Sequence, residues 1–263
     1  MKLIGIGRTA EIYNYSEDKI IKLFYQDYNE NVQREFKINL LIQNKFSNTA
    51  KAYEKTVFEN RKGIIFNKIN GKSLLKIMFE RPQKIEENMK IFYENQKKIN
   101  DIEIKNGLER YEEEIVELIK RNDLLDKKLI EYILNIVNNT EKRNNICHGD
   151  YHPDNLLVEK NETYVIDWIN ARIGNPIIDK ARTYILLKFG SLPEEQDEDT
   201  LKRIEIMRKK IVEKYIELIE KDIENTELFF KWTLVIAAAR ISEDIPKKEK
   251  NILKNYILDN LEY

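Results

Sequence analysis

The sequence predicts an α+β fold with two lobes, a small N-terminal lobe with an antiparallel sheet and one helix, and a larger, mainly helical C-terminal lobe. Three observations carry this prediction. Short apolar runs separated by turn residues fill the first seventy residues, helical periodicity dominates the rest, and the polar stretch 70–73 interrupts the pattern between them. We therefore place the lobes at 1–70 and 71–263, with a hinge at about 67–71.

The N-terminal lobe is predicted to contain four strands and a helix. The strands are expected at 10–15, 19–25, near 52–59 and 63–69, with turn-prone residues between the members of each pair. A helix over 29–43 follows from apolar residues at every fourth position, Val32, Phe36 and Leu40. This arrangement gives a small antiparallel sheet that carries one helix.

The C-terminal lobe begins where Ser73 can cap a helix, and helical patterns continue to about residue 144. A mixed stretch at 146–167 includes apolar strands at 156–158 and 164–166, and the remainder is helical again. One apolar stripe runs over six turns, and we assign it to the core with no cofactor role: Leu201, Ile204, Met207, Ile211, Tyr215, Ile219 and Ile223.

Composition limits the classes of function. The 45 lysines and arginines nearly balance the 46 aspartates and glutamates, which gives no electrostatic basis for binding nucleic acid. No uncharged apolar run reaches the ~18 residues of a membrane span, and Arg8 breaks the apolar N-terminal stretch before it reaches signal-peptide length. The single Cys147 cannot form an internal disulfide. We expect a cytoplasmic protein that needs no nucleic acid, membrane or protein partner.

The run 147–155 carries the chemistry-bearing residues. His148-Gly149-Asp150, four residues and then Asn155 reproduce the spacing of a kinase catalytic loop, in which the aspartate is the base and the asparagine a magnesium ligand. Twelve residues later the apolar strand ends at Asp167, where a second metal-holding carboxylate belongs. Alone, each feature is simply a turn or a strand end. Their joint order and spacing favour phosphoryl transfer.

A second motif lies at the N-terminus, where Gly5-Ile6-Gly7-Arg8-Thr9-Ala10 matches G-x-G-x-x-(G/A). A dinucleotide-binding site competes as an interpretation, but it requires a helix directly after the glycines, and a hairpin pattern follows here. A glycine loop between antiparallel strands fits better, because glycines let backbone N–H groups approach phosphates. Gly5, Gly7, Arg8 and Thr9 are therefore candidate phosphate contacts.

Lys22 interrupts the apolar run 20–24, and a lysine in a mostly buried strand is costly unless paired. A phosphate and a carboxylate are the expected partners, and Glu35 is favoured over Glu30 because it lies beside an apolar helix position. The alternative is a lysine on a solvent-exposed sheet edge. At the hinge, backbone groups of Asn67 and Ile69 are candidates to pair with a nucleobase.

These motifs resemble the aminoglycoside phosphotransferase and choline kinase group, which shares the protein-kinase-like bilobal fold. The resemblance rests on 147–158 and 165–179, and extends to the glycine loop and Lys22. His152, two residues after Asp150, and Trp168 after the second aspartate favour this group over protein kinases. The histidines expected near 97–101 are missing, and Ala10 replaces the third glycine.

The resemblance implies a role for each site residue. Asp150 is the catalytic base, and Asn155 and Asp167 bind Mg²⁺. His152 either supports the loop or neighbours the transferred phosphate. Lys22 contacts the phosphates of ATP or GTP, with Glu35 as its partner. Asp179 is expected to anchor the catalytic loop.

We thus predict a magnesium-dependent kinase that transfers the γ-phosphate to a hydroxyl of a small molecule. The acidic run 194–199 could attract a cationic acceptor, although a solvated loop is the simpler interpretation. A nucleotide-binding pseudokinase and a protein kinase are the competing hypotheses. The intact site residues disfavour the first, and the missing activation-loop signature disfavours the second.

Overall fold

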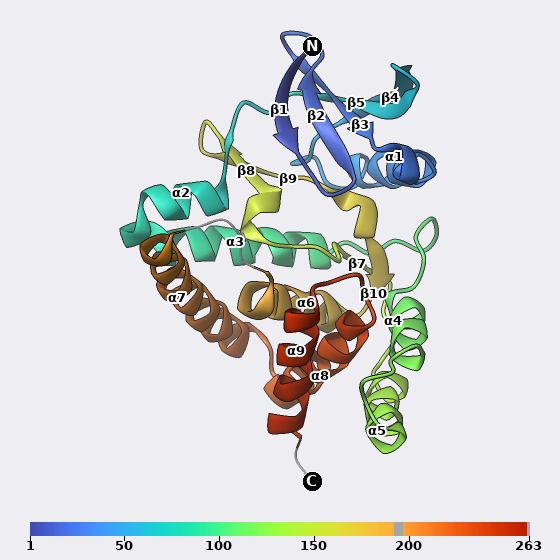
Figure 1. The fold of residues 1–263 in the computed structure, drawn as a ribbon, viewed down its shortest axis with the longest axis vertical. Coiled ribbons are helices and arrows are strands. Elements are labelled where there is room, and N and C mark those ends of the chain that lie inside the picture. Colours follow the sequence, from blue (N-terminus) through green and yellow to red (C-terminus); the bar gives the residue numbers. More distant parts are fainter. Residues whose placement is uncertain (192–196, 262–263) are drawn as a thin grey trace. The chain divides into compact units, whose positions relative to one another are not determined.

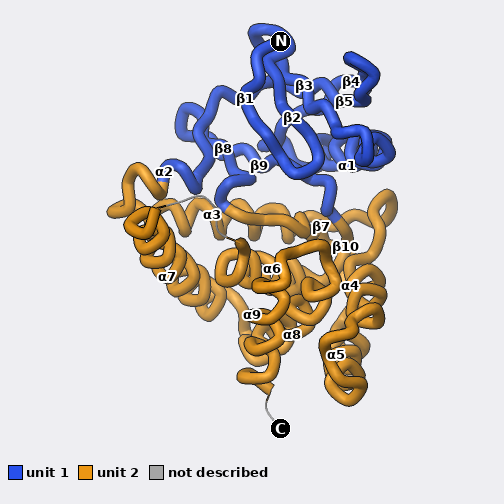
Figure 2. The backbone as a smooth tube through the Cα atoms, viewed as in Figure 1, with its two compact units in different colours: residues 1–77, 153–171 blue, residues 78–152, 172–263 orange. Residues whose placement is uncertain are grey.

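The computed structural model describes residues 1–191 and 197–261 and divides the chain into two compact units (Figure 2). Unit 1 comprises 1–77 together with 153–171, and unit 2 comprises 78–152 together with 172–263. This division differs from a single boundary near residue 70, because the segment 153–171 folds with the N-terminal part of the chain. The α+β class is confirmed, with the sheet in unit 1 and most helices in unit 2 (Figure 1).

Unit 1 contains a five-stranded antiparallel sheet in the order β1-β2-β3-β5-β4. The strands are β1 (Lys2–Ile6), β2 (Ala10–Asn14), β3 (Lys19–Phe24), β4 (Ala52–Phe58) and β5 (Arg61–Asn67). The last of these begins two residues earlier than predicted. Glu59 and Asn60 both have positive φ, which makes a two-residue hairpin turn and pairs Phe58 directly with Arg61.

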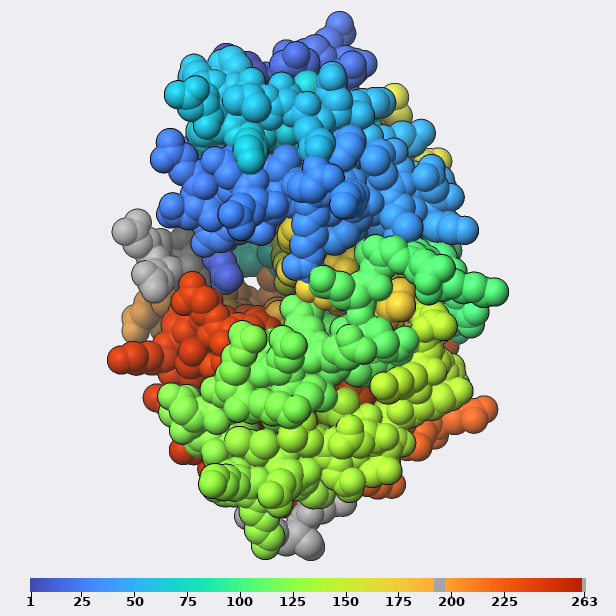
Figure 3. All heavy atoms as spheres, turned by 90° about the vertical axis from the view of Figure 1, so that its right-hand side faces the viewer, coloured from blue at the N-terminus to red at the C-terminus, as the bar shows by residue number. Residues whose placement is uncertain are grey.

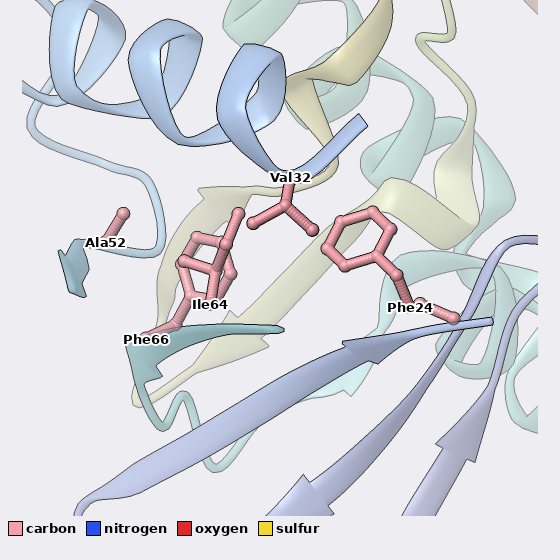
Figure 4. Packing of buried hydrophobic residues seen from close by; sticks show 6 residues of the cluster. Phe24, Val32, Ala52, Ile64 and Phe66 are labelled. Atoms are coloured by element: carbon pink, nitrogen blue, oxygen red, sulfur yellow. The ribbon is translucent and has the colours of Figure 1, made fainter. Parts of the chain in front are cut away.

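Helix α1 (Asn31–Gln43) packs against one face of this sheet. Figure 4 shows Val32 of the helix meeting Phe24 and Ile64 of the strands, within a core cluster that also includes Ala10. The buried face is rotated from the predicted stripe, because Phe36 and Leu40 are only partly buried whereas Glu35 is buried. A carboxylate therefore lies on the inner face of the helix.

The segment 153–171 joins unit 1 through backbone pairing. It contains a 3₁₀ turn, Pro153–Asn155, then the hairpin β8 (Leu156–Glu159) and β9 (Glu162–Val165), which pairs with the short β6 (Lys72–Ser73). The N–H of Val165 donates to the carbonyl of Asn48 at 2.9 Å, and the indole of Trp168 donates to Thr49 Oγ1 at 2.8 Å. Sequence periodicity does not reveal these long-range bonds.

Helix α2 (Leu74–Glu80) crosses the boundary between the units. Ser73 caps it as predicted, since its Oγ accepts a hydrogen bond from the Lys76 N–H at 3.3 Å.

The described part of unit 2 is built from helices and one short antiparallel strand pair, β7 (Asn145–Cys147) with β10 (Arg172–Gly174). Its helices are α3 (Ile85–Asn100), α4 (Tyr111–Lys120), α5 (Lys127–Asn138), α6 (Pro176–Phe189), α7 (Glu198–Asp222), α8 (Thr226–Ile241) and α9 (Lys247–Asp259). The apolar α8 is almost wholly buried and packs against α4, α5, α6 and α9. In Figure 3, α4 and α5 form an outer layer of the unit.

Helix α7 confirms the middle of the long apolar stripe as core, because Met207, Ile211, Tyr215 and Ile219 are buried. The two ends of the stripe, at Leu201 and Ile223, are only partly buried. Within the ranges 1–191 and 197–261, no helix combines the length and apolar character needed to cross a membrane.

Candidate active site

An ion-pair cluster lies beside the sheet of unit 1. Lys22 of β3 extends its ammonium to both oxygens of Glu35 in α1, at 2.8 and 3.0 Å, and to Oδ1 of Asp167 at 3.0 Å. Lys22 is on the central strand of the sheet, and its neighbours Ile21 and Leu23 point into a core. The structure thus joins Lys22 to the carboxylate expected from the sequence and to a second one, and the solvent-exposed edge is excluded.

The three side chains of this cluster are buried to different extents, and burial shifts the pKa values of Lys22 and Glu35. Burial alone would lower the pKa of Lys22, but the carboxylates of Asp167 and Glu35 outweigh it and hold that pKa above its ordinary value. Burial raises the pKa of Glu35, because its side chain is only 2 % exposed and the ammonium of Lys22 compensates only in part. Asp167 is different, since 40 % of its side chain is exposed. It can therefore bind a ligand from solvent.

Asp167 follows β9 in a left-handed backbone conformation, with φ 66° and ψ 66°. This conformation costs roughly 1–2 kcal/mol for a non-glycine residue, and such strain is concentrated at functional positions. Asn155 is anchored next to it, because its carbonyl accepts a hydrogen bond from the Ile166 N–H at 3.0 Å. The two predicted metal ligands are thus attached to neighbouring points of one backbone framework.

The glycine motif forms the turn between β1 and β2. Gly5 lies within β1, and the N–H of Gly7 donates to the Ala10 carbonyl at 2.8 Å. Thr9 accepts a bond from the Tyr25 N–H at 2.9 Å, and Arg8 is exposed between these anchors. Because a strand follows the glycines, the dinucleotide-binding interpretation fails. Ala10, the replacement for the third glycine, contributes its methyl group to the core.

The predicted nucleobase-binding segment continues from β5. Asn67 is its last residue, and Oδ1 of Asn67 accepts from the Lys51 N–H at 2.6 Å. The N–H of Lys68 donates to Asp18 at 2.8 Å and that of Asn70 to Glu159 at 2.9 Å. Ile69 lies between these two anchored peptides.

Asp150 and His152 belong to unit 2. Nε2 of His152 lies 3.7 Å from Oδ2 of Asp150, and both side chains are about one-third exposed. The N–H of Asp150 donates to Nδ1 of His148 at 3.3 Å. Burial would raise the pKa of Asp150, but its contact with His152 and the positive charges of His152 and Arg182 hold the pKa well below its usual range. Asp150 is therefore ionised at neutral pH.

The backbone just before Asp150 is supported by helix α6. Gly149 has a positive φ of 78°, and its N–H donates to Oδ1 of the fully buried Asp179 at 2.8 Å. Asp179 thus anchors the catalytic loop as expected. The carbonyl of Gly149 accepts from Arg182 Nε at 3.2 Å, a contact that the sequence analysis missed. The spacing of Asp179 and Arg182, three residues apart on one helix face, was the available signal.

The unit boundary separates the predicted site residues into two groups. Lys22, Glu35 and Asp167 contact one another in unit 1, which also contains Asn155, the glycine turn and the hinge segment. Asp150 and His152 contact each other in unit 2, and the boundary falls between His152 and Pro153. Among the residues that the structure describes, no group of three or more His, Cys, Asp or Glu side chains could hold a metal ion. Glu194, Glu195 and Gln196 of the predicted acidic run lie outside the described residues.

Comparison with known proteins gives consistent results at two levels. Residues 96–208 match the model of the phosphotransferase enzyme family, and a search of curated protein sequences found no match to the chain. Among solved structures, the GDP and kanamycin complex of APH(2")-IIia superposes with a TM-score of 0.61 at 14 % identity, covering 99 % of this chain and 93 % of that one.

Two further solved structures show the same fold. The streptomycin–ATP–APH(2")-IIa complex has a TM-score of 0.56 at 14 % identity, with 98 % of this chain and 90 % of that one covered. The amicoumacin kinase hAmiN, in complex with AMP-PNP, Ca²⁺ and Ami, has a TM-score of 0.58 at 11 % identity and coverages of 98 % and 87 %. Residues 96–208 are thus similar to the phosphotransferase enzyme family, and the chain as a whole shares the fold of these solved structures.

Proposed function

We propose that this protein is an ATP-dependent kinase that transfers the γ-phosphate to a hydroxyl group of a small molecule. The observation that carries the proposal is the cluster of Lys22, Glu35 and Asp167. A lysine buried between two carboxylates, one buried and one open to solvent, supplies a fixed cation for phosphates and a solvent-accessible carboxylate for a metal ion.

The nucleotide is proposed to bind to unit 1. Glu35 holds the Lys22 ammonium in place, and that ammonium contacts the α- and β-phosphates. The turn at Gly7–Thr9 would bring the backbone N–H groups of Arg8 and Thr9 to the phosphates, while the Gly7 N–H holds the turn through the Ala10 carbonyl. Backbone groups of Asn67 and Ile69 pair with the edge of the nucleobase, which leaves both ATP and GTP as donors to be compared.

Asn155 and Asp167 would hold Mg²⁺ with the help of phosphate oxygens. The donor set fits this ion, because Mg²⁺ is commonly bound by one or two carboxylates together with substrate phosphates. A bound Mg²⁺ supplies charge neutralisation on the β- and γ-phosphates. Lys22 engages the same carboxylate of Asp167, so metal binding would release one of its two partners.

Asp150 is proposed to orient the acceptor hydroxyl and to take its proton as the oxygen attacks the γ-phosphorus. Its low pKa keeps it ionised and ready to accept a hydrogen bond, and His152 limits the directions in which the carboxylate can point. This low pKa makes Asp150 a weak base, which suits a loose transition state that needs little proton transfer before the phosphoryl group has left.

The acceptor class is tested by a coupled screen over aminoglycosides, choline, amino alcohols and sugars that follows release of ADP from ATP and of GDP from GTP. We expect metal-dependent turnover with at least one hydroxyl compound, and a kcat lowered by about 10²–10⁴-fold in Asp150→Ala. Binding of nucleotide without turnover of any acceptor would refute the kinase and favour a pseudokinase. Phosphate transfer to a protein substrate alone would refute the small-molecule acceptor.

A further inference from the structure

Arg182 holds the backbone of the catalytic loop from helix α6. Its Nε donates to the Gly149 carbonyl at 3.2 Å, while its two terminal nitrogens engage the two oxygens of Glu243, Nη2 to Oε2 at 3.1 Å. Only 11 % of the Arg182 side chain is exposed. A buried guanidinium therefore uses all three nitrogens, one on the loop and two on a carboxylate.

The peptide groups on either side of Gly149 are thereby fixed by two residues of one helix. Asp179 accepts the Gly149 N–H at 2.8 Å, and Arg182, one turn further along α6, donates to the Gly149 carbonyl. Gly149 has a φ of 78°, and because a glycine lacks a side chain its backbone could adopt many other conformations. Two bonds from a rigid helix remove that freedom at the residue immediately before Asp150.

The orientation of Arg182 is set in turn by a network of alternating acidic and basic side chains. Glu243 also accepts from Arg240 Nη1 at 2.9 Å, and Arg240 Nε donates to Glu249 at 2.7 Å. Glu249 is buried and accepts a further bond from the Ser191 hydroxyl at 2.5 Å. This network of ion pairs and hydrogen bonds connects α6 and the C-terminal end of α8 to α9. The planar guanidinium bonds to the Gly149 carbonyl and to Glu243 at the same time, and the single ammonium of a lysine at position 182 could not make both contacts in this geometry.

We propose that Arg182, oriented by Glu243, is a positioning residue for the phosphotransfer reaction: it fixes the Gly149 peptide so that the Asp150 carboxylate is held where it meets the acceptor hydroxyl. The inference rests on the proposed function, because it assigns Arg182 a role through Asp150. Arg182 also contributes positive charge that favours the ionised form of Asp150.

The competing explanation is that Arg182 only stabilises the fold through a buried ion pair. Lys180 provides a matched control on the same helix, because it is also a buried cation paired with a carboxylate, Asp222, at 3.4 Å. The ammonium of Lys180 contacts Asp222 of α7 and lies over the Tyr93 ring of α3, whereas the guanidinium of Arg182 bonds directly to Gly149. A purely structural role predicts similar consequences for Arg182→Ala and Lys180→Met.

The test compares Arg182→Ala, Arg182→Lys, Glu243→Gln and Lys180→Met with the wild type, using the acceptor found in the screen. Arg182→Ala and Arg182→Lys should each lower kcat about 100-fold, the loss expected for a misplacement of about 1 Å, with the KM for nucleotide changed less than twofold. Glu243→Gln should lower kcat about tenfold, and Lys180→Met less than threefold. Added guanidinium should restore part of the kcat of Arg182→Ala but not that of Asp150→Ala.

A second measurement does not depend on turnover. The Gly149 amide should exchange its hydrogen at least tenfold faster in Arg182→Lys than in the wild type, while Lys180→Met leaves that rate unchanged. The proposal is overturned if Arg182→Lys retains kcat within threefold, or if Lys180→Met loses as much. A wild-type protein without turnover refutes the proposed function instead, and the Gly149 exchange rate then still decides whether Arg182 holds the loop.

Discussion

Replacing Lys22 with methionine should destabilise the protein in a way that depends on pH. Methionine matches the length of the lysine stem, so the packing beside Phe24 on the same face of the sheet is kept while the cation is lost. Glu35, whose side chain is 2 % exposed, then remains next to Asp167 without the ammonium that lies 2.8 Å away in the wild type. An uncompensated buried carboxylate must either stay charged at high cost or take up a proton.

The free energy of protonating Glu35 sets an upper limit on this loss of stability. The ordinary pKa of a glutamate is 4.5, so neutralising Glu35 in the folded state costs at most about 3.4 kcal/mol at pH 7 and about 0.7 kcal/mol at pH 5, at 1.36 kcal/mol per pH unit. Burial already raises the pKa of Glu35 beside Lys22, so part of this cost is present in the wild type. We expect Lys22→Met to lower the free energy of unfolding by about 2 kcal/mol at pH 7 and by less than about 1 kcal/mol at pH 5.

The sign follows from linkage. A carboxyl group whose pKa is raised by folding binds its proton more tightly in the folded state, so it stabilises the fold below pH 4.5 and loses this effect as pH rises through the folded-state pKa. Urea denaturation at both pH values measures the difference. Lys19→Met, on the same strand, is the control and should cost about 0.5–1 kcal/mol through its contact with the Tyr53 ring, equally at both pH values. A loss for Lys22→Met that is as large at pH 5 as at pH 7 would refute the reasoning.

Three further predictions concern the aspartates. Asp150→Ala should lower kcat by about 10²–10⁴-fold while the dissociation constant for nucleotide, measured by calorimetry, changes less than twofold; a weakened affinity would argue against its role as base. Asp167→Gly should be about 1 kcal/mol more stable in urea than Asp167→Ala, because φ is 66° there, and both should lose metal-dependent nucleotide binding. Asp179→Asn should lower the free energy of unfolding by about 2–3 kcal/mol, because an amide N–H₂ group would face the donors of Gly149 or Asn100; a neutral effect in urea would contradict it.

Local patterns in the sequence predicted the sheet, helix α1 and the ion pair of Lys22 with Glu35. Alternation of apolar residues is a property of neighbours in the chain, and a lysine that interrupts it stands out. The same patterns placed the hydrophobic stripe of α1 on Phe36 and Leu40, whereas the structure buries Glu35. A buried carboxylate on the inner helix face, paired with Lys22, breaks the periodicity on which the prediction depends.

Long-range hydrogen bonds account for what the sequence did not predict. The assignment of 153–171 to unit 1 depends on backbone bonds such as that from Val165 to Asn48, and no side-chain pattern encodes such a pairing. The contact of Arg182 with the loop before Asp150 was not predicted for a related reason. Its partners Gly149 and Glu243 lie 33 and 61 residues away, so its environment becomes visible only after folding.

The spacing between Asp150 and Asn155 can now be given a physical cause, because different parts of the chain anchor its two ends. The Asp150 end is held through Gly149 by two side chains of α6, whereas the Asn155 end is held by the backbone of Ile166, directly after β9. Changes to the α6 anchors should therefore alter turnover while nucleotide and metal affinity persist, and changes to β9 should do the reverse. Each end of the loop therefore depends on a different anchor, and the four residues between them keep the proposed base and the proposed metal ligand on one short segment of chain.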